Sequence, residues 1–169
     1  YMENEVLNNQ GKIEKILEKI KEKQKVLILI SVLLVVIIIL FAGYTYNLGK
    51  KSEKVAEKYI QAGIYLSNND LKISENIFQE IIFSKNKIYS PLALYAVVDN
   101  NLENDKEKIL DYFEIVEKLK VEKNQLDLIK FKKALYLLKI SEQEKGQKIL
   151  EELVNSNSAW KETALEILN

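Results

Sequence analysis

The sequence predicts an all-α protein in which a single N-terminal transmembrane helix is followed by an array of helical hairpins. No charged residue occurs between Val26 and Gly49, a stretch long enough to cross a membrane. After residue 50, apolar side chains recur at intervals of three, four and seven, without sustained alternation. Only five glycines and one proline occur in 169 residues, which argues against a turn-rich β protein.

The ionisable residues exclude several kinds of chemistry. The 25 basic residues are all lysine, they balance 25 acidic residues, and the chain has neither histidine nor cysteine. Ser-His-Asp and Cys-His catalysis, imidazole or thiolate metal sites and disulfides are therefore excluded. A neutral chain also argues against a nucleic-acid partner, which needs a basic face. We expect no metal, no cofactor and no small-molecule substrate.

Residues 1–25 are predicted to form a short amphipathic leader. It carries six lysines and five acidic residues, which gives a net charge of +1. Its apolar residues recur at helical spacing over two turns. They are Ile13, Ile16, Leu17 and Ile20. The stripe contacts the membrane surface or a partner, or it simply extends the anchor helix into solvent; its shortness favours the extension.

Residues 26–48 are the predicted transmembrane anchor. The run VLILISVLLVVIIILFAGY begins at Val26 and contains Ser31 as its only conventional polar residue before the final tyrosine. At about 1.5 Å per residue, some 20 residues cross a ~30 Å hydrocarbon core. A buried core helix is rarely so long and so apolar. A cleaved signal peptide has a shorter apolar stretch of about 7–15 residues, and Ala42-Gly43-Tyr44 is a poor cleavage site.

Lysines near the anchor predict its orientation. Residues 11–25 contain six lysines and residues 43–57 contain three. Because positive charge favours the cytoplasmic side, we expect the leader in the cytoplasm and residues 50–169 in the periplasm of a bacterium, with membrane lipid around residues 26–48.

Residues 50–169 are the predicted helical domain, with a net charge of −1 from 19 lysines and 20 acidic residues. Helix-start signals recur along it. Ser52 is expected to cap a helix running to about Ser67, Asn69-Asp70 to open a second, Ser90-Pro91 a third and Asn104-Asp105 a fourth. Further helices are expected near 125–140, 142–154 and 159–168, with Ser141 and Ser158 as caps.

A repeat emerges when the acidic residues that open alternate helices are aligned. Asp70, Asp105 and Glu142 are 35 and 37 residues apart. A small residue precedes each by eight positions and another follows by four, and bulky apolar residues follow by eight and eleven. The pattern weakens at Val97 and Ile109, so the middle unit is the least regular. The sets are Ala62, Val97 and Ala134; Ser74, Ile109 and Gly146; Phe78, Phe113 and Leu150; Ile81, Val116 and Leu153. Small residues allow close helix approach, which predicts stacked hairpins, although a plain helical bundle remains the alternative.

This pattern resembles the tetratricopeptide repeat, a 34-residue helix–turn–helix unit, over about residues 55–155. The family's first-helix aromatic is present only as Tyr65 and its proline between units only as Pro91. A leader, one anchor and degenerate repeats also resemble the ancillary subunit of the bacterial SecYEG translocon. The likeness is closest in KKALYLLKISEQEKGQKILEEL (Lys132 to Leu153) and NSNSAWKETALEIL (Asn155 to Leu168).

That resemblance implies an inner-membrane, non-enzymatic scaffold whose periplasmic repeats bind proteins, with SecYEG and periplasmic chaperones as partners. Members of the family usually continue with another helix, so the last helix here would lack its partner. The alternative function is a structural subunit or assembly factor of another envelope complex, such as the division or cell-wall machinery. A catalytic role is a distant third, because nothing in the sequence indicates a pocket that would shift the pKa values of neighbouring carboxylates such as Glu151 and Glu152.

The candidate protein-binding residues are tyrosines on the first helix of each hairpin, which lines the concave face of a repeat array. They are Tyr59, Tyr65, Tyr95 and Tyr136. Tyrosine offers a large contact area and a polar group, although each of the four could equally pack between helices. Trp160 is expected to anchor the last helix in the core. The segment from Asp99 to Glu107 fails as a calcium loop, because its sixth position is asparagine and its twelfth leucine.

Overall fold

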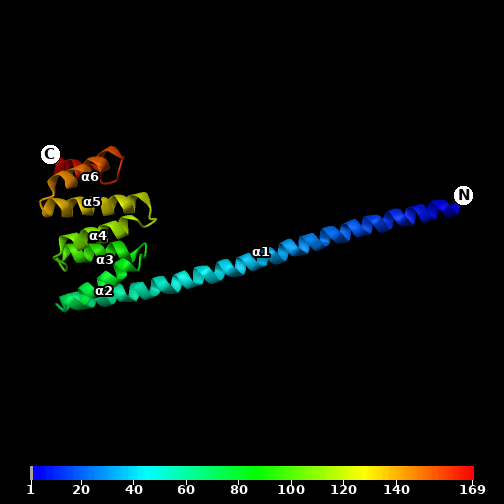
Figure 1. The fold of residues 1–169 in the computed structure, drawn as a ribbon, viewed down its shortest axis with the longest axis horizontal. Coiled ribbons are helices and arrows are strands. Elements are labelled where there is room, and N and C mark those ends of the chain that lie inside the picture. Colours follow the sequence, from blue (N-terminus) through cyan, green and yellow to red (C-terminus); the bar gives the residue numbers. More distant parts are fainter. Residues whose placement is uncertain (1) are drawn as a thin grey trace. The chain divides into compact units, whose positions relative to one another are not determined.

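The computed structural model is all-α (Figure 1) and describes the backbone of Met2–Asn169 and the side chains of 21, 23–26, 28–43 and 49–169. The stripe predicted within the leader, Ile13 to Ile20, lies outside the described side chains. Seven helices are present in the described part of the chain. They are α1 (Met2–Ser67), α2 (Leu71–Phe83), α3 (Tyr89–Asp99), α4 (Lys106–Glu117), α5 (Lys123–Lys139), α6 (Gln143–Asn155) and α7 (Lys161–Leu168).

The chain divides into two compact units, residues 1–50 and residues 51–169. Within the described backbone, the first unit consists of the part of helix α1 that ends at Lys50. The second contains the last part of α1 and the six shorter helices. The finer division of the first unit into a leader and an anchor stays a prediction.

Helix α1 corrects one predicted boundary. Ser52 was expected to cap a new helix, but it lies inside α1, where its Oγ accepts a hydrogen bond from Asn86 Nδ2 at 3.2 Å. The helix continues because residues 2–67 contain no proline, and the glycine at position 49 costs only about 1 kcal/mol in a helix interior. Ser52 therefore cannot act as an N-cap, because the backbone does not leave the helix at this position.

The second unit is built of helical pairs in sequence order. The last turns of α1 pack on α2, where Ser74 Oγ donates to the Ala62 carbonyl oxygen at 2.9 Å and Lys58 pairs with Glu80 at 2.6 Å. Helix α3 packs on α2 and on α4, α5 packs on α4 and most extensively on α6, and α7 packs against α6 (Figure 1). Helix α2 also contacts α4, and α3 contacts α5, so equivalent helices of successive hairpins lie side by side. The fold predicted from the sequence is therefore confirmed as an array of helical hairpins.

The acidic residues used to align the repeat are the N-caps of the second helices. Asp70 caps α2, Asp105 caps α4 and Glu142 caps α6. Only Asp105 uses its side chain, which accepts from the backbone N–H groups of Glu107 and Lys108 at 2.9 and 3.3 Å. Each second helix thus begins where the sequence predicts.

The serine caps expected elsewhere are wrong or partial. Ser90 lies inside α3, and Asn86 satisfies the start of that helix instead, because its Oδ1 accepts from the N–H of Ile88 and of Tyr89. Ser141 takes a left-handed conformation with φ of 68° and leaves the cap to the next residue. Ser158 comes closest, since its Oγ accepts from the N–H of Trp160, the N-cap of α7.

Two apolar clusters form the core of the second unit. The larger is made by α1 to α5 and centres on fully buried aromatic and aliphatic side chains such as Phe78, Leu94 and Phe113. The smaller joins α5, α6 and α7 through Phe131, Leu150 and Ala164, among others. Trp160 stacks on Phe131 with ring centroids 5.0 Å apart, so it anchors the last helix as expected.

Candidate membrane anchor and interaction grooves

The first candidate element is the apolar stretch of α1. The candidate membrane span runs from Lys23 to Gly43, its most apolar 18-residue window has a mean hydropathy of 3.4, and no described residue of that window is buried. Leu29 and Phe41 are 71% and 68% exposed. The Ser31 hydroxyl donates to the Ile28 carbonyl oxygen at 2.8 Å, so this polar group is satisfied within its own helix. The helix has the length and composition of a membrane anchor or a signal sequence.

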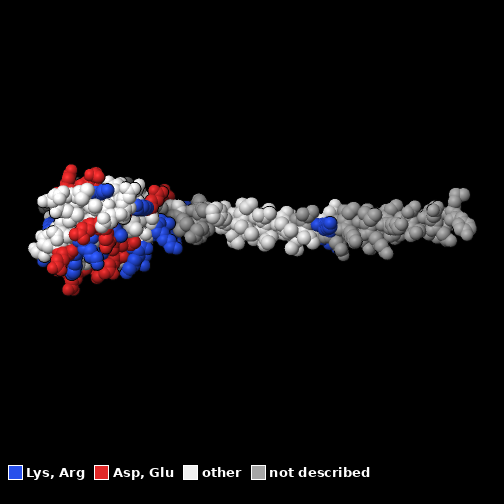
Figure 2. All heavy atoms as spheres, turned by 90° about the horizontal axis from the view of Figure 1, so that it is seen from above, with Lys and Arg blue, Asp and Glu red and all other residues white. Residues whose placement is uncertain are grey.

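Figure 2 shows the same stretch without acidic or basic colour beyond its first lysines, whereas both signs mix over the second unit. Because no part of the first unit covers these side chains, the segment is not a core helix there. An apolar surface of this size is stable only when lipid or another apolar partner covers it.

The second candidate element is the hairpin repeat, whose aligned positions are all buried. Ala62 and Ala134 are fully buried and face Ser74 and Gly146 of the following helix. Ser74 hydrogen-bonds the Ala62 carbonyl oxygen, and a Cβ placed on Gly146 would lie 3.1 Å from the equivalent oxygen of Ala134. The first and third hairpins therefore close through the same backbone approach.

The turns between helices share a feature that the sequence reasoning missed. The residues that follow α1, α2, α3, α5 and α6 include one with positive φ. They are Asn69, Lys85, Asn101, Ser141 and Asn157, with φ between 50° and 68°. At Asn69 the chain forms both bonds of a Schellman motif, since Asp70 N–H donates to Tyr65 O and Asn69 N–H to Leu66 O. Asparagine after a helical stretch was the available signal, because it tolerates the left-handed region.

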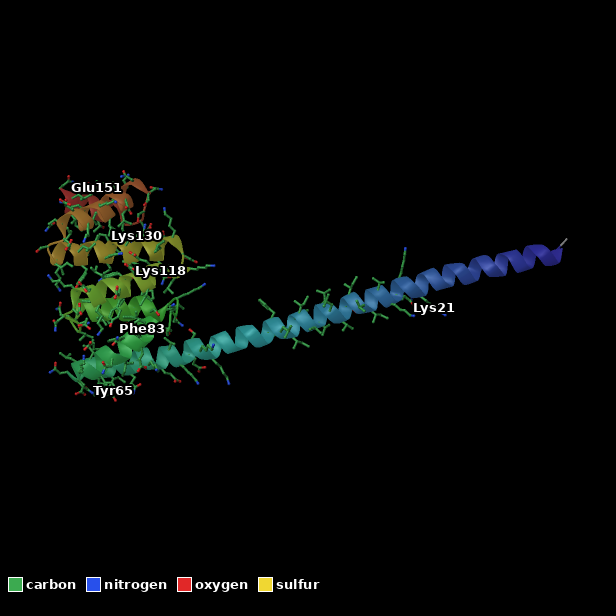
Figure 3. The ribbon with its side chains drawn as sticks, in the orientation of Figure 1. Lys21, Tyr65, Phe83, Lys118, Lys130 and Glu151 are labelled. Atoms are coloured by element: carbon green, nitrogen blue, oxygen red, sulfur yellow. The ribbon has the colours of Figure 1, made fainter. Side chains whose placement is uncertain are left out.

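Two of the four candidate tyrosines lie on α1. Tyr59 is half-buried and packs edge-on against Phe78, with centroids 5.6 Å apart, and lies 5.7 Å from Tyr89. Tyr65 is half-buried beside the first turn, where Figure 3 labels it. Tyr59 therefore contributes to the packing of α1 on its neighbours.

The other two candidates are Tyr95 on α3, which is half-buried, and Tyr136 on α5, which is buried. Tyr136 is 6% exposed, and its ring centroid lies 6.0 Å from that of Phe113, while burial raises its pKa. The Tyr95 hydroxyl is buried without a hydrogen-bond partner among the described residues, and burial together with the Asp99 carboxylate raises its pKa to about 12. The ring contacts of Tyr59 and Tyr136 are with aromatic side chains of the core cluster, so these two contribute to packing between helices. A protein-binding role for the four tyrosines stays a prediction.

Open grooves lie instead beside the second helices. One of about 260 Å³ runs between α2 and α4, with Phe83, Tyr112 and Ile115 as its apolar wall. Phe83 is 52% exposed, and its ring meets that of Tyr112 edge-on at 5.8 Å. Figure 3 labels Phe83 and Lys118, which both line this groove. Nothing in the sequence marked Phe83 as a surface residue, since it continues the apolar pattern of α2.

A second groove of about 350 Å³ lies between α4, α5 and α6. Leu110, Leu137 and Ile149 form its apolar part, with lysines and glutamates around them. Glu114 lines this groove and the one beside α2, so the two adjoin on α4. Apolar floors with mixed charged rims are typical of protein-binding surfaces.

An ion-pair network beside the α2–α4 groove connects α2, the loop before α4 and the first turn of α4. Lys108 pairs with Glu103 from the preceding loop and lies 3.7 Å from Glu75 on α2. The hydrogen bond from Lys108, followed by backbone donors, lowers the pKa of Glu103 to about 2. The Glu103 hydrogen bond in turn raises the pKa of Lys108. The pair therefore stays ionised at neutral pH and ties the start of α4 to its preceding loop.

Within the described residues, no three acidic side chains converge in a way that could hold a metal ion. The grooves contain lysines, glutamates and apolar side chains, and their titratable groups lie mostly in ion pairs such as Lys118–Glu114 and Lys133–Glu117. No family model, curated protein or solved structure matches this chain.

Proposed function

We propose that this chain is a non-enzymatic, membrane-anchored scaffold whose hairpin array binds proteins. The observation that carries the proposal is the combination of an exposed 21-residue apolar helix with a separate array that presents open, apolar-floored grooves. The first feature supports residence at a membrane, and the second supports docking of a protein segment.

The anchor is proposed to remain uncleaved. The apolar stretch from Val26 to Gly43 is longer than the ~7–15 residues of a signal-peptide core. The lysine excess before the stretch supports a cytoplasmic leader and a periplasmic array.

The likeness to the ancillary SecYEG subunit supports a narrower proposal. The segments Lys132–Leu153 and Asn155–Leu168 carry that likeness, and they cover the second half of α5 together with α6 and α7. The array would then bind the translocon or periplasmic folding factors, and assist proteins that have just crossed the membrane. A subunit of another envelope complex is the second candidate, because a membrane anchor joined to protein-docking grooves would serve that role equally.

Co-purification from native membranes tests the proposal. The tagged full-length protein is extracted in mild detergent, and its partners are identified by mass spectrometry. SecYEG subunits or a periplasmic isomerase that disappear when residues 1–48 are replaced by an unrelated anchor support the translocon. A reproducible eluate without them favours another envelope complex, and an empty eluate contradicts the scaffold.

A matched pair of variants tests the grooves. Phe83→Ala removes the exposed aromatic wall of the α2–α4 groove, and we expect it to release a bound partner. Ile88→Ala removes a side chain that is 59% exposed and lies outside the grooves, so it should retain the partner. Equal retention by both variants argues against docking in this groove.

A further inference from the structure

The turns at the two ends of the helical array carry opposite charge. Four lysines and one glutamate occur in the α2–α3, α4–α5 and α6–α7 turns, which are residues 84–88, 118–122 and 156–160. Four acidic residues and no lysine occur in the α1–α2, α3–α4 and α5–α6 turns, which are residues 68–70, 100–105 and 140–142. The chain as a whole is neutral, so its charge is segregated along the direction of the helices.

Hydrogen bonds hold the lysine-bearing turns together at one end of the array. Asn86 Nδ2 donates to Ser52 Oγ at 3.2 Å, which places the α2–α3 turn beside the first residues that α1 contributes to the second unit. Gln125 Nε2 donates to the Lys87 carbonyl oxygen at 2.8 Å, which places the start of α5 next to the same turn. Figure 1 shows all three turns at the end where α1 enters the array.

We call this surface the lysine face and define it by Lys85, Lys87, Lys118 and Lys120. All four lysines are exposed. Among the described residues, only Lys118 pairs with a carboxylate, that of Glu114 at 3.4 Å. Lys87 and Lys120 precede the starts of α3 and α5, where the helix dipole disfavours positive charge. Helix stability therefore does not explain why lysines occur at these positions.

The lysine face keeps a positive surplus when the acidic residues around it are counted. Residues 51–54 of α1 lie at the same end and bring the total to six lysines against two glutamates. On the adjoining helices, Glu80 and Glu117 are each held in an ion pair, with Lys58 and Lys133 respectively. An anionic surface is therefore the electrostatic complement of this end of the array.

The chain itself keeps the lysine face near a membrane. The candidate span ends at Gly43, and Ser52, which binds the α2–α3 turn, follows nine residues later. Nine residues reach at most about 30 Å in any conformation. Ile88 is 59% exposed beside Lys87 and offers an apolar side chain to the headgroup region. The anionic surface that lies within reach is that of the bilayer.

We propose that the lysine face docks on anionic lipid headgroups of the membrane in which the chain is anchored. This inference rests on the anchor of the proposed function and adds a second contact with lipid. Each lysine near an anionic bilayer favours the docked state by about fivefold. The aliphatic stems let the ammonium groups reach the phosphates while Ile88 enters the interface. The acidic turns then face away from the bilayer.

Fluorescence quenching in nanodiscs tests the docking of the full chain. Asn124→Cys, exposed at the start of α5, reports on the lysine face, and Gln143→Cys, exposed at the start of α6, reports on the opposite end. Each cysteine carries a fluorophore, and the lipids carry a nitroxide on their headgroups. In equal parts of phosphatidylglycerol and phosphatidylcholine, we expect stronger quenching of Asn124→Cys. The difference should vanish in phosphatidylcholine alone and in about 1 M NaCl, where the Debye length is about 3 Å.

A matched pair of lysine variants identifies the contact. Lys85→Gln combined with Lys87→Gln removes two charges from the lysine face, so the ratio of docked to undocked arrays should fall about 25-fold. Lys106→Gln combined with Lys148→Gln removes two exposed lysines elsewhere and should leave the quenching unchanged. Equal quenching of the two labels, or quenching that ignores either phosphatidylglycerol or the first pair of substitutions, overturns the inference.

Flotation of proteoliposomes separates this inference from the anchor. A chain that floats with phosphatidylcholine vesicles in about 1 M NaCl, but shows no preferential quenching with phosphatidylglycerol, keeps the anchor and overturns the docking. A chain that does not float contradicts both. If preferential quenching is absent and Lys85→Gln with Lys87→Gln loses a co-purified protein, the lysine face binds an acidic protein, which also overturns the assignment to lipid.

Discussion

Two glycines in helices differ in what a methyl group would meet. A Cβ on Gly146 would lie 2.8 Å from Leu138 Cδ2, 2.9 Å from its Cγ and 3.1 Å from the Ala134 carbonyl oxygen. A Cβ on Gly63 meets nothing within 4 Å. We expect Gly63→Ala to raise the free energy of unfolding by about 0.5–1 kcal/mol through helix propensity. Gly146→Ala should lower it by about 1–2 kcal/mol because the gain is outweighed by overpacking.

Urea unfolding of the full chain in micelles, followed by far-UV circular dichroism, measures both variants. Equal stabilisation by the two substitutions would mean that α5 and α6 are not held at the close approach seen in the third hairpin.

The Glu103–Lys108 pair predicts a loss of stability in acid. The Lys108 hydrogen bond and the backbone donors lower the Glu103 pKa from 4.5 to about 2, so the carboxylate stabilises the fold above pH 4.5. This contribution falls as the pH drops toward 2. We expect Glu103→Gln to cost about 1–2 kcal/mol at pH 6 and much less near pH 2.

Urea unfolding at both pH values measures this difference. Glu114→Gln is the control, because its pair with Lys118 is mostly exposed and should matter little at either pH. A Glu103→Gln deficit that is the same at both pH values contradicts the assigned cause.

Residue burial was predictable where the repeat constrains it. Ala62, Ser74 and Phe78 are buried, as their spacing from Asp70 indicates. The exposed or unpaired side chains were not predictable in the same way. Asp127 belongs by its neighbours to a solvated lysine-rich helix, and only the fold shows that it is 5% exposed.

At the scale of the elements, the second helices begin with different caps. The Asp105 side chain accepts two backbone N–H groups at the start of α4, whereas Asp70 makes no side-chain cap hydrogen bond at the start of α2. Asp105→Ala should therefore lower the free energy of unfolding by about 1 kcal/mol, and Asp70→Ala by a few tenths. Thermal unfolding of the two variants side by side measures the contrast, and equal losses contradict this assignment of the caps.

The order of helices follows from periodicity, but several of their ends do not. Helices α5 and α6 start within two residues of their predicted positions, because the apolar pattern fixes which segments must bury a face. Ser52 and Ser90 look like caps in sequence but lie within helices. A cap depends on where the chain turns, and those turns occur at left-handed residues such as Asn69.

For the whole molecule, the continuous helix α1 joins an apolar stretch to the first hairpin. Residues 2–67 form one helix, which contains both the segment Lys23–Gly43 and Ala62 of the first hairpin. A helix start was predicted between them at Ser52, because serine is a preferred N-cap residue. The physical reason for continuity is that neither apolar nor lysine-rich residues break a helix in the absence of proline.

Orientation across the membrane is the prediction that the lysine distribution makes for the whole chain. Six lysines in residues 11–25 against three in residues 43–57 favour a cytoplasmic leader. The chain has no cysteine, so single-cysteine variants give an unambiguous label. Gln147→Cys, at an exposed position of α6, should react with a membrane-impermeant maleimide on intact spheroplasts. Gln10→Cys should react only after permeabilisation.

The same two variants separate an anchor from a cleaved signal sequence. An uncleaved anchor keeps both cysteines in one membrane-bound chain of full mass, whereas cleavage leaves Gln147→Cys in a shorter, released product. Labelling of Gln10→Cys on intact spheroplasts would show the opposite orientation, with the leader outside the cytoplasm. If the charge bias sets the direction of insertion, moving three lysines from the leader to residues 43–57 should invert the expected pattern. Gln10→Cys would then be labelled on intact spheroplasts, and Gln147→Cys only after permeabilisation.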